Sequence, residues 1–206
     1  MNLVVGLGNP GRKYEATRHN AGFWWVERLA RAARIDFRYE ARFHGDVAKV
    51  AAPDGEVWLL KPDTSMNHSG RAVAALAGFY KWIPEQILVV HDELDLNPGT
   101  VRLKKGGGTA GHNGLSDIAA QLGTKDFWRV RIGIGHPRNQ AATEQEVVDY
   151  VLHKPGTADH AAIDDAISRS LEVWPLIAAD KLEAAMLKLH TKSTGERREA
   201  RGDESP

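Results

Sequence analysis

The chain has 206 residues, of which 27 are lysine or arginine, 27 are aspartate or glutamate and none is cysteine. Because the charges balance, no overall basic field marks a nucleic-acid partner, and any contact with a polyanion has to come from a local patch. The missing cysteines exclude disulfides, thiolate metal ligands and thiol nucleophiles. The apolar start is short and no apolar run is long enough to span a bilayer, so we expect neither a secretory leader nor a membrane segment. These features favour one cytoplasmic domain over two small ones.

Apolar spacing predicts that strands and helices alternate along the chain. In chain order, the N-terminal half contains a short buried strand around Val4, a helix over 21–33, a hairpin over 43–62 that turns at Asp54-Gly55, a helix over 69–82 capped by Ser69, and a strand over 86–96. The C-terminal half continues with a glycine-rich loop over 103–114, a helix over 115–122, a strand over 127–137, and a helical region over about 161–190 that breaks near Trp174-Pro175.

This alternation is typical of an α/β fold, and the hairpin makes the sheet mixed rather than wholly parallel. We therefore expect a single domain over residues 1–190, built as a twisted mixed β-sheet flanked by helices on both faces. Residues 191–206 contain too few apolar side chains to pack, and we expect a disordered C-terminal tail there.

The first strand runs into Gly6-Leu7-Gly8-Asn9-Pro10-Gly11, which matches the glycine spacing of a dinucleotide-binding loop. Such a loop works when it opens a helix at once and an acidic residue follows about 20 positions later. Here the helix is expected to begin only near Asn20, Pro10 removes a backbone donor, and the nearest acidic candidate, Glu27, lies inside that helix. A nicotinamide or flavin enzyme is thus the weaker interpretation. The glycines either make a sharp turn or present Asn9 at the carboxyl end of the strand.

Polar side chains gather where the predicted strands end. Asn9 follows the first strand, Asn67 follows the hairpin, and Asp92 lies at the end of the strand that contains ILVV. Asn113 lies where the glycine-rich loop enters a helix, and His19 lies just before the first helix. Because ligands of open α/β sheets bind outside the carboxyl ends of the strands, we expect these side chains to share one site.

A histidine and an aspartate at such a site suit hydrolysis by activated water. A neutral imidazole, with an ordinary pKa of about 6.5, can take a proton from water, and a carboxylate on its other nitrogen fixes the tautomer. This assigns His19 as the base and Asp92 as its partner. Asparagine side chains donate to a developing oxyanion and accept from substrate N–H groups without adding charge. No serine lies in a nucleophile elbow, which disfavours a covalent acyl-enzyme.

Each of these residues also has a purely structural interpretation. His19 can be a surface or satisfied core histidine, Asp92 can belong to a solvated turn or a weak cation site, and asparagine is common in turns because it tolerates left-handed backbone. We interpret His91, His112 and His136 as local hydrogen-bonding residues. No two histidines have the close spacing of zinc ligands, so we expect no metal site.

A basic, glycine-rich run follows at Lys104-Lys105-Gly106-Gly107-Gly108. The glycines permit close approach, the lysines supply charge, and the helix after Asn113 offers a positive N-terminus, a combination typical of an anion site. Arg129 and Arg131 share one face of the next strand by its two-residue period and could extend the patch. The alternative is a solvated charged face.

Four blocks of the sequence, in order, resemble the signature motifs of the bacterial peptidyl-tRNA hydrolase family: GLGNPGRKYEATRHNAG, PDTSMNHSG, HDELDL and GGGTAGHNG. The resemblance runs from Leu3 to about His190. It implies a cytosolic, usually monomeric α/β enzyme without metal or cofactor, which cleaves the ester between a nascent peptide and the 3′ ribose of tRNA and so recycles stalled tRNA. It implies no membrane and no obligate protein partner.

By motif match, the resemblance implies that His19 is the catalytic base and Asp92 its partner. The substrate-positioning residues of the family correspond to Asn9, Tyr14, Met66, Asn67 and Asn113, and its tRNA-phosphate contacts correspond to Lys104 and Arg131. The sequence departs from the commonest spelling of the family, outside the proposed catalytic residues, at Ser65, Asn97 and Thr109-Ala110.

We therefore predict an esterase that acts on peptidyl-tRNA, in which His19 activates water, Asp92 orients His19, and the asparagines hold the peptide and stabilise the oxyanion. Two alternatives come from other classes of protein. One is a non-catalytic RNA-binding protein, as in one branch of the family, and the other is a dinucleotide oxidoreductase. Turnover of an N-blocked aminoacyl-tRNA excludes the first, and titration with NADH tests the second.

Overall fold

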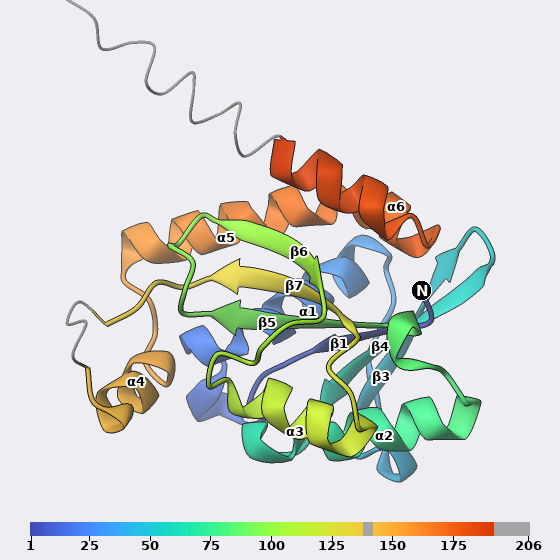
Figure 1. Ribbon diagram of the computed structural model, residues 1–206, viewed down its shortest axis with the longest axis horizontal. Coiled ribbons are helices and arrows are strands. Elements are labelled where there is room, and N and C mark those ends of the chain that lie inside the picture. The colour runs from blue at the N-terminus through green and yellow to red at the C-terminus, as the bar shows by residue number, and fades with distance from the viewer. Residues whose placement is uncertain (138–141, 192–206) are drawn as a thin grey trace, which may run out of the picture.

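A seven-stranded β-sheet lies at the centre of the computed structural model, which describes residues 1–137 and 142–191 (Figure 1). The strands are β1 (Leu3–Gly6), β2 (Arg38–Glu40), β3 (Gly45–Ala52), β4 (Gly55–Pro62), β5 (Ile87–Glu93), β6 (Val101–Lys105) and β7 (Trp128–Gly133). Their order in the sheet is β2-β3-β4-β1-β5-β7-β6. Strands β4, β1, β5 and β7 are parallel, whereas β2, β3 and β6 pair antiparallel with their neighbours. The sheet is therefore mixed, as predicted.

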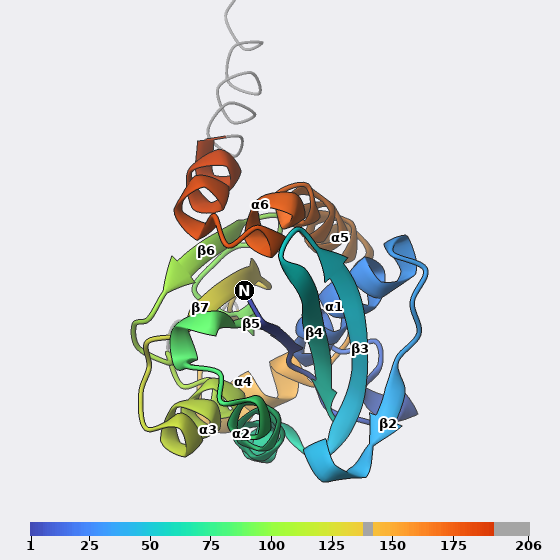
Figure 2. The same ribbon diagram turned by 90° about the vertical axis from the view of Figure 1, so that its right-hand side faces the viewer.

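Helices cover both faces of the sheet. The α-helices are α1 (Ala21–Ala32), α2 (Ser69–Tyr80), α3 (Asn113–Leu122), α4 (Glu144–Val151), α5 (Thr157–Leu171) and α6 (Trp174–Ala178), and residues 182–191 are also helical. Figure 2 shows α2 and α3 on one side of the sheet and α1 and α5 on the other. The predicted fold class, a single α/β domain with helices on both faces, is confirmed.

Two apolar cores lie on opposite faces of the sheet, because successive side chains of a strand point in opposite directions. Leu3 and Val5 of β1 pack in the core that contains Leu76 of α2, whereas Val4 packs in the core that contains Trp25 of α1. All five side chains are fully buried. Burial of each such side chain contributes about 1.5–3 kcal/mol relative to exposure. The packing therefore holds the central strands, whose ends carry the site, from both sides.

The start of α2 differs from the prediction. A 3-10 turn over Met66–His68 leads directly into the helix, so Ser69 already has helical backbone, with φ −58° and ψ −33°. Its hydroxyl donates to the carbonyl oxygen of Met66 at 2.8 Å. The prediction that Ser69 caps the helix is wrong, because Ser69 is the first residue of the helix rather than the residue before it.

Three elements have no counterpart among the predicted ones, namely β2, β6 and α4. Residues 103–105, expected in the glycine-rich loop, belong to β6, an edge strand with two exposed lysines at its end. The α4 helix carries only a narrow apolar stripe between acidic residues. The C-terminal helical region begins at Thr157, breaks before Trp174 as predicted, and breaks again at Asp180, whose backbone is left-handed with φ 58°.

Two further expectations concern the ends of the chain and the membrane. Among the described residues, no helix is both long and apolar enough to cross a membrane. The tail expected over 191–206 lies, from residue 192 onwards, outside the described residues.

Candidate active site

Glycines bring the first helix into contact with the sheet. A Cβ on Gly22 of α1 would lie 2.3 Å from the carbonyl oxygen of Val90 in β5, and a Cβ on Gly6 of β1 would lie 2.4 Å from the carbonyl oxygen of Gly22. Only glycine permits such contacts. Two 3-10 turns separate the GLGNPG stretch from α1, so this stretch does not open a helix as a dinucleotide-binding loop does. The close packing instead places the turn that carries His19 beside the carboxyl ends of β1 and β5.

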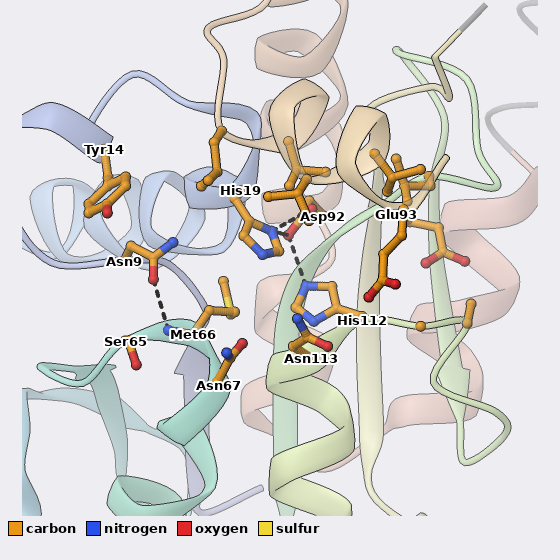
Figure 3. Close-up of a pocket in the computed structure, with 18 residues that line it drawn as sticks. Asn9, Tyr14, His19, Ser65, Met66, Asn67, Asp92, Glu93, His112 and Asn113 are labelled. Carbon is orange, nitrogen blue, oxygen red and sulfur yellow. Dashed lines mark hydrogen bonds and ion pairs between the residues drawn. The ribbon is translucent and has the colours of Figure 1, made fainter. Parts of the chain in front are cut away.

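A cavity of about 360 Å³ lies outside the carboxyl ends of β1, β4 and β5 (Figure 3). This is the position at which open α/β sheets bind ligands. The structure brings together there the polar residues predicted to share a site and the two neighbours implied by the family motifs: Asn9, Tyr14, His19, Met66, Asn67, Asp92 and Asn113. The α4 helix forms one side of the same cavity through Val147, Val148 and Val151.

His19 and Asp92 form a hydrogen-bonded pair. Nδ1 of His19 lies 3.0 Å from Oδ1 and 2.9 Å from Oδ2 of Asp92. An ionised carboxylate only accepts hydrogen bonds, so Nδ1 carries the proton and Nε2 keeps its lone pair. The other ring nitrogen points away from Asp92 into the cavity (Figure 3). His19 therefore has the tautomer that a general base needs.

A second histidine completes the cluster. Nε2 of His112 lies 2.9 Å from Oδ1 of Asp92, and Nδ1 of His112 accepts a hydrogen bond from the backbone N–H of Leu115 at 3.3 Å. Because Nδ1 is the acceptor, Nε2 carries the proton and donates it to Asp92. His112 was expected to be only a local hydrogen-bonding residue, and that expectation missed its contact with the carboxylate. Its position directly before Asn113, at the start of α3, is the signal in the sequence that points to it.

His19, Asp92 and His112 are also a possible donor set for a metal ion, since their ligand atoms lie within 4.8 Å of one another. Two imidazoles and a carboxylate are ligands that zinc accepts. The tautomers argue against this use, because both nitrogens that face Asp92 carry protons that a metal would displace. Binding through Nε2 of His112 would also turn an N–H group toward the N–H of Leu115. The hydrogen bonds account for the geometry of the cluster without a metal.

Two of these groups, His19 and Asp92, have shifted pKa values. Burial would lower the pKa of His19, but the charge of Asp92 and the hydrogen bond to it outweigh burial and hold that pKa above its ordinary value of 6.5. Burial would raise the pKa of Asp92, but His19 and His112 outweigh it and lower that pKa below its ordinary range. Asp92 is therefore ionised at neutral pH, and it favours the protonated form of His19.

The side chain of Asn9 has a fixed orientation. Its Oδ1 accepts a hydrogen bond from the backbone N–H of Met66 at 2.8 Å, and its backbone exchanges two hydrogen bonds with the side chain of Asn20 at 2.9 and 3.0 Å. Since Oδ1 is occupied, the Nδ2 donor is the group turned to the cavity (Figure 3). The side chains of Asn67 and Asn113 have no hydrogen bond to another described residue and line the same space.

Comparison with known proteins agrees with the motifs. A family model described as peptidyl-tRNA hydrolase matches residues 3–197. The chain belongs to the peptidyl-tRNA hydrolase family. It is 59% identical over 192 residues to the peptidyl-tRNA hydrolase of Nitrosospira multiformis, which covers 93% of this chain and 98% of that protein. It is 56% identical to the peptidyl-tRNA hydrolase of Neisseria meningitidis serogroup C, with the same coverage of 93% and 98%.

Solved structures of the family have the same fold. The crystal structure of peptidyl-tRNA hydrolase from Acinetobacter baumannii superposes with a TM-score of 0.87 at 43% identity, over 92% of this chain and 94% of that chain. The family and the fold predicted from the motifs are thus confirmed, and so is the expectation that the protein is a hydrolase that acts on ester bonds.

The two residues that match the tRNA-phosphate contacts of the peptidyl-tRNA hydrolase family lie outside the first cavity. Lys104 and Arg131 line a neighbouring cavity of about 280 Å³. Glu93 lines both cavities, and Nε of Arg131 donates to Oε1 of Glu93 at 3.2 Å. Lys104 forms no ion pair with another described residue and lies opposite Arg129 in the pairing of β6 with β7. The basic residues are therefore adjacent to the His19 cavity but separate from it.

Arg129, which was expected to extend the basic patch, is 2% exposed. Its guanidinium donates to the carbonyl oxygens of Gly108 at 2.6 Å and Gly107 at 2.9 Å. Burial, followed by the charge of Arg131, lowers the pKa of Arg129. Arg129 lines the second cavity, but its hydrogen bonds serve to hold the glycine-rich loop.

His91 precedes Asp92 in β5 and points to the other face of the sheet. Its ring is 1% exposed, and its Nδ1 lies 2.7 Å from the backbone carbonyl oxygen of Asp92. Burial, followed by the nearby His112, lowers the pKa of His91 to about 3. His91 is therefore neutral and bonds locally, as predicted, and His136 likewise contacts the carbonyl oxygen of Pro137.

Proposed function

We propose that this protein hydrolyses the ester bond between a peptide and the 3′ ribose of tRNA with a water molecule that His19 activates, and without a covalent intermediate. The observation that carries the proposal is the contact of Nδ1 of His19 with Asp92, from which the tautomer of His19 follows. Asp92 accepts from Nδ1 at 2.9 Å, which leaves the lone pair of Nε2 directed into the cavity. Ser65 also lines the cavity, but no hydrogen bond joins it to His19, so nothing there activates its hydroxyl as a nucleophile.

In the proposed reaction, the water oxygen attacks the ester carbonyl carbon while Nε2 of His19 removes a proton from that water. The ionised Asp92 stabilises the imidazolium that forms, and His112 holds the carboxylate from the other side. The tetrahedral intermediate then loses its bond to the ribose oxygen, and His19 returns the proton to that oxygen. The products are a peptide with a free carboxyl group and a tRNA with a free 3′ hydroxyl.

The asparagines supply neutral hydrogen bonds around the reacting carbonyl. We assign Asn9, Asn67 and Asn113 to the peptide backbone and to the oxyanion of the intermediate, with Tyr14 and Met66 beside them in the cavity lining. Amide groups that bond a peptide unit are left unpaired by the charged amino group of a free aminoacyl-tRNA. The proposal therefore includes a preference for N-blocked over unblocked substrates.

The tRNA phosphates are assigned to the neighbouring cavity. Lys104 and Arg131 place two cations on adjacent strands there, beside the glycine-rich loop and next to the cavity that contains His19. The proposed setting is translation, in which the enzyme recycles tRNA in the cytoplasm as a monomer, with no metal, cofactor or obligate protein partner.

The proposal is tested by the release of free tRNA from an N-acetyl-aminoacyl-tRNA. We expect turnover by the wild-type protein and a loss of about two or more orders of magnitude in His19→Ala. His136→Ala is the matched control, since this exposed histidine bonds only locally. Turnover that survives in His19→Ala would overturn the mechanism but keep the reaction. Wild-type protein that binds tRNA without turnover would favour the RNA-binding alternative, and equal rates on blocked and unblocked substrates would remove the role of the asparagines.

A further inference from the structure

The three residues of the 3-10 turn over Arg18–Asn20 contact three different parts of the cavity wall. His19 bonds to Asp92 at the end of β5, and Asn20 bonds to the backbone of Asn9 after β1. Arg18 bonds to the C-terminal end of α4. The turn that carries His19 therefore also connects α4 to the strands.

Arg18 makes several contacts with the end of α4. Its Nη1 donates to the carbonyl oxygens of Tyr150 at 3.1 Å, His153 at 3.2 Å and Lys154 at 3.3 Å. Its backbone N–H donates to the same carbonyl of His153 at 3.1 Å. The guanidinium carbon lies 4.0 Å from the centroid of the Tyr150 ring, and the residue is 8% exposed. Tyr150 belongs to the last turn of α4, and His153 and Lys154 lie in the segment that follows the helix. Carbonyl groups at a helix C-terminus are negatively polarised, so this buried cation stabilises the end of α4 together with the segment after it.

Different contacts hold the two ends of α4. At its N-terminus, Thr143 accepts from the backbone N–H of Glu146 at 3.2 Å, and the Glu146 side chain accepts from the backbone N–H of Thr143 at 2.6 Å, so that end is capped by its own residues. At its C-terminal end, the hydroxyl of Tyr150 donates to the carbonyl oxygen of Ile134 at 2.7 Å. Val151 packs in the apolar core that contains Trp25, and Arg18, the chain neighbour of His19, adds hydrogen bonds to the backbone at this end.

The same helix supplies an apolar wall to the cavity. Val147, Val148 and Val151 line it, and Val148 is 37% exposed. A wall of valines opposite the asparagines suits the apolar side chain of the residue esterified to tRNA. Its contact with that side chain depends on how far α4 lies from His19.

We propose that Arg18 is a positioning residue that sets the distance between the α4 wall and His19, and thereby determines how well the enzyme binds a bulky side chain next to the scissile ester. The inference rests on the proposed function of His19. Arg18 acts through α4 and not on the reacting atoms. Two consecutive residues thus have different roles: His19 transfers the proton, and Arg18 holds the valine wall of α4 in place.

Three variants separate this role from general stability. Arg18→Met keeps an unbranched side chain over the Tyr150 ring but removes every side-chain donor, and Arg18→Lys keeps the cation with a single donor group. Arg28→Met is the matched control. Arg28 links α1 to α5 by donating to the carbonyl oxygen of Asp164 at 3.0 Å and to the hydroxyl of Ser168 at 2.9 Å, and it does not line the cavity that contains His19.

The kinetic test compares N-acetyl-phenylalanyl-tRNA with N-acetyl-glycyl-tRNA. For Arg18→Met we expect KM for the phenylalanyl substrate to rise about tenfold, the change expected when an apolar pocket loses part of its contact with a side chain. The glycyl substrate should change less, kcat should stay close to the wild-type value for both, and Arg18→Lys should recover part of the loss. Arg28→Met should change neither constant. A fall in kcat for both substrates with unchanged KM would overturn the proposal, as would an equal effect of Arg28→Met.

Hydrogen exchange of the free protein tests the same contact without substrate. Amides of residues 144–151 should exchange faster in Arg18→Met than in the wild type or in Arg28→Met. Unchanged exchange in that helix would overturn the proposal even if the enzyme is active. Wild-type protein that hydrolyses neither substrate would overturn the proposed function, and the role of Arg18 in substrate binding with it. Faster exchange without an effect on KM would overturn the role of Arg18 alone.

Discussion

Replacing Asp92 by asparagine removes one charge and changes the shape of the site very little. Nδ1 of His19 lies 3.0 and 2.9 Å from the two carboxylate oxygens, so in either orientation of the variant amide the NH₂ group lies as close to Nδ1 as the remaining oxygen does. The NH₂ group of the amide and the Nδ1–H of His19 are both donors and cannot bond each other. The neutral imidazole therefore favours the tautomer that carries its proton on Nε2 instead of Nδ1. In the proposed mechanism, Nε2 is the nitrogen that accepts the proton of water. His112, at 2.9 Å from Oδ1, competes for the amide oxygen that remains.

The size of the loss follows from this change of tautomer. A positioned base contributes about 10²–10⁴-fold, and we expect kcat/KM of Asp92→Asn to fall by about that factor. The pH profile changes as well. Activity requires neutral His19, so it rises with pH through the pKa of His19, which Asp92 holds above 6.5. Without the charge, burial dominates and lowers that pKa, so the acid limb of kcat/KM moves to below 6.5.

The assay is the release of tRNA from N-acetyl-aminoacyl-tRNA, measured across the acid limb for the wild type, Asp92→Asn and Asp117→Asn. Asp117 serves as the control because its carboxylate accepts from the backbone N–H of Gly70 at 2.7 Å and does not line the cavity. Loss of the Asp117 carboxylate should lower the stability of the protein and leave the acid limb of kcat/KM at its wild-type pH. An Asp92→Asn variant that keeps the wild-type limb and loses less than about tenfold in kcat/KM would refute the assignment of His19 as the general base.

Three further predictions concern stability and tRNA binding. His91, with its pKa lowered to about 3, stays neutral when folded, so stability is lost as pH falls below 6.5. From pH 6.5 to 4.5 the wild type should lose about 2 kcal/mol of unfolding free energy that His91→Asn retains in denaturant unfolding. An equal loss of unfolding free energy in the two proteins over this pH range would contradict the prediction. Lys104→Ala and Arg131→Ala should raise KM more at low salt than at high salt, with kcat little changed, and a salt-independent effect would remove the phosphate role. Gly22→Ala puts a Cβ 2.3 Å from a backbone oxygen and should lower the free energy of unfolding by at least about 1–3 kcal/mol, whereas an unchanged melting temperature would show that α1 moves freely away from β5.

Local patterns in the sequence were enough to predict the sheet, the two helical layers and the place of the site. Buried strands and amphipathic helices each have their own apolar period, and the residue that follows a parallel strand lies at a known edge of the sheet. This is why Asn9 and Asp92 could be placed before the structure was known. Their roles in catalysis stay predictions, which the experiments above address.

The features that the sequence did not predict depend mainly on contacts between segments that are distant in the chain. The role of His112 arises because the start of α3 meets the end of β5. Its place directly before Asn113 points to the site, but it does not predict which residue His112 contacts there. The α4 helix was missed because its valines face a cavity, so Val148 remains 37% exposed and the helix lacks the broad apolar stripe of a core helix. Ser69 was misassigned because a 3-10 turn and a helix cap look alike when only the residue type is known.

The distribution of charge between the two cavities explains how a polyanion can present a neutral ester to His19. The described residues that line the first cavity include the carboxylates Asp92, Glu93 and Glu144 and no lysine or arginine. The second cavity is lined by the cations Lys104, Arg129 and Arg131, which outnumber its carboxylates Glu93 and Asp95. On the proposed function, phosphates are repelled from the first cavity and attracted to the second, so the uncharged ester end of the tRNA is the part that enters beside His19. Neutral asparagines suit the first cavity for the same reason, because a cation there would bind a phosphate in the place of the ester. Affinity for tRNA and chemistry at the ester are therefore expected to respond to different residues.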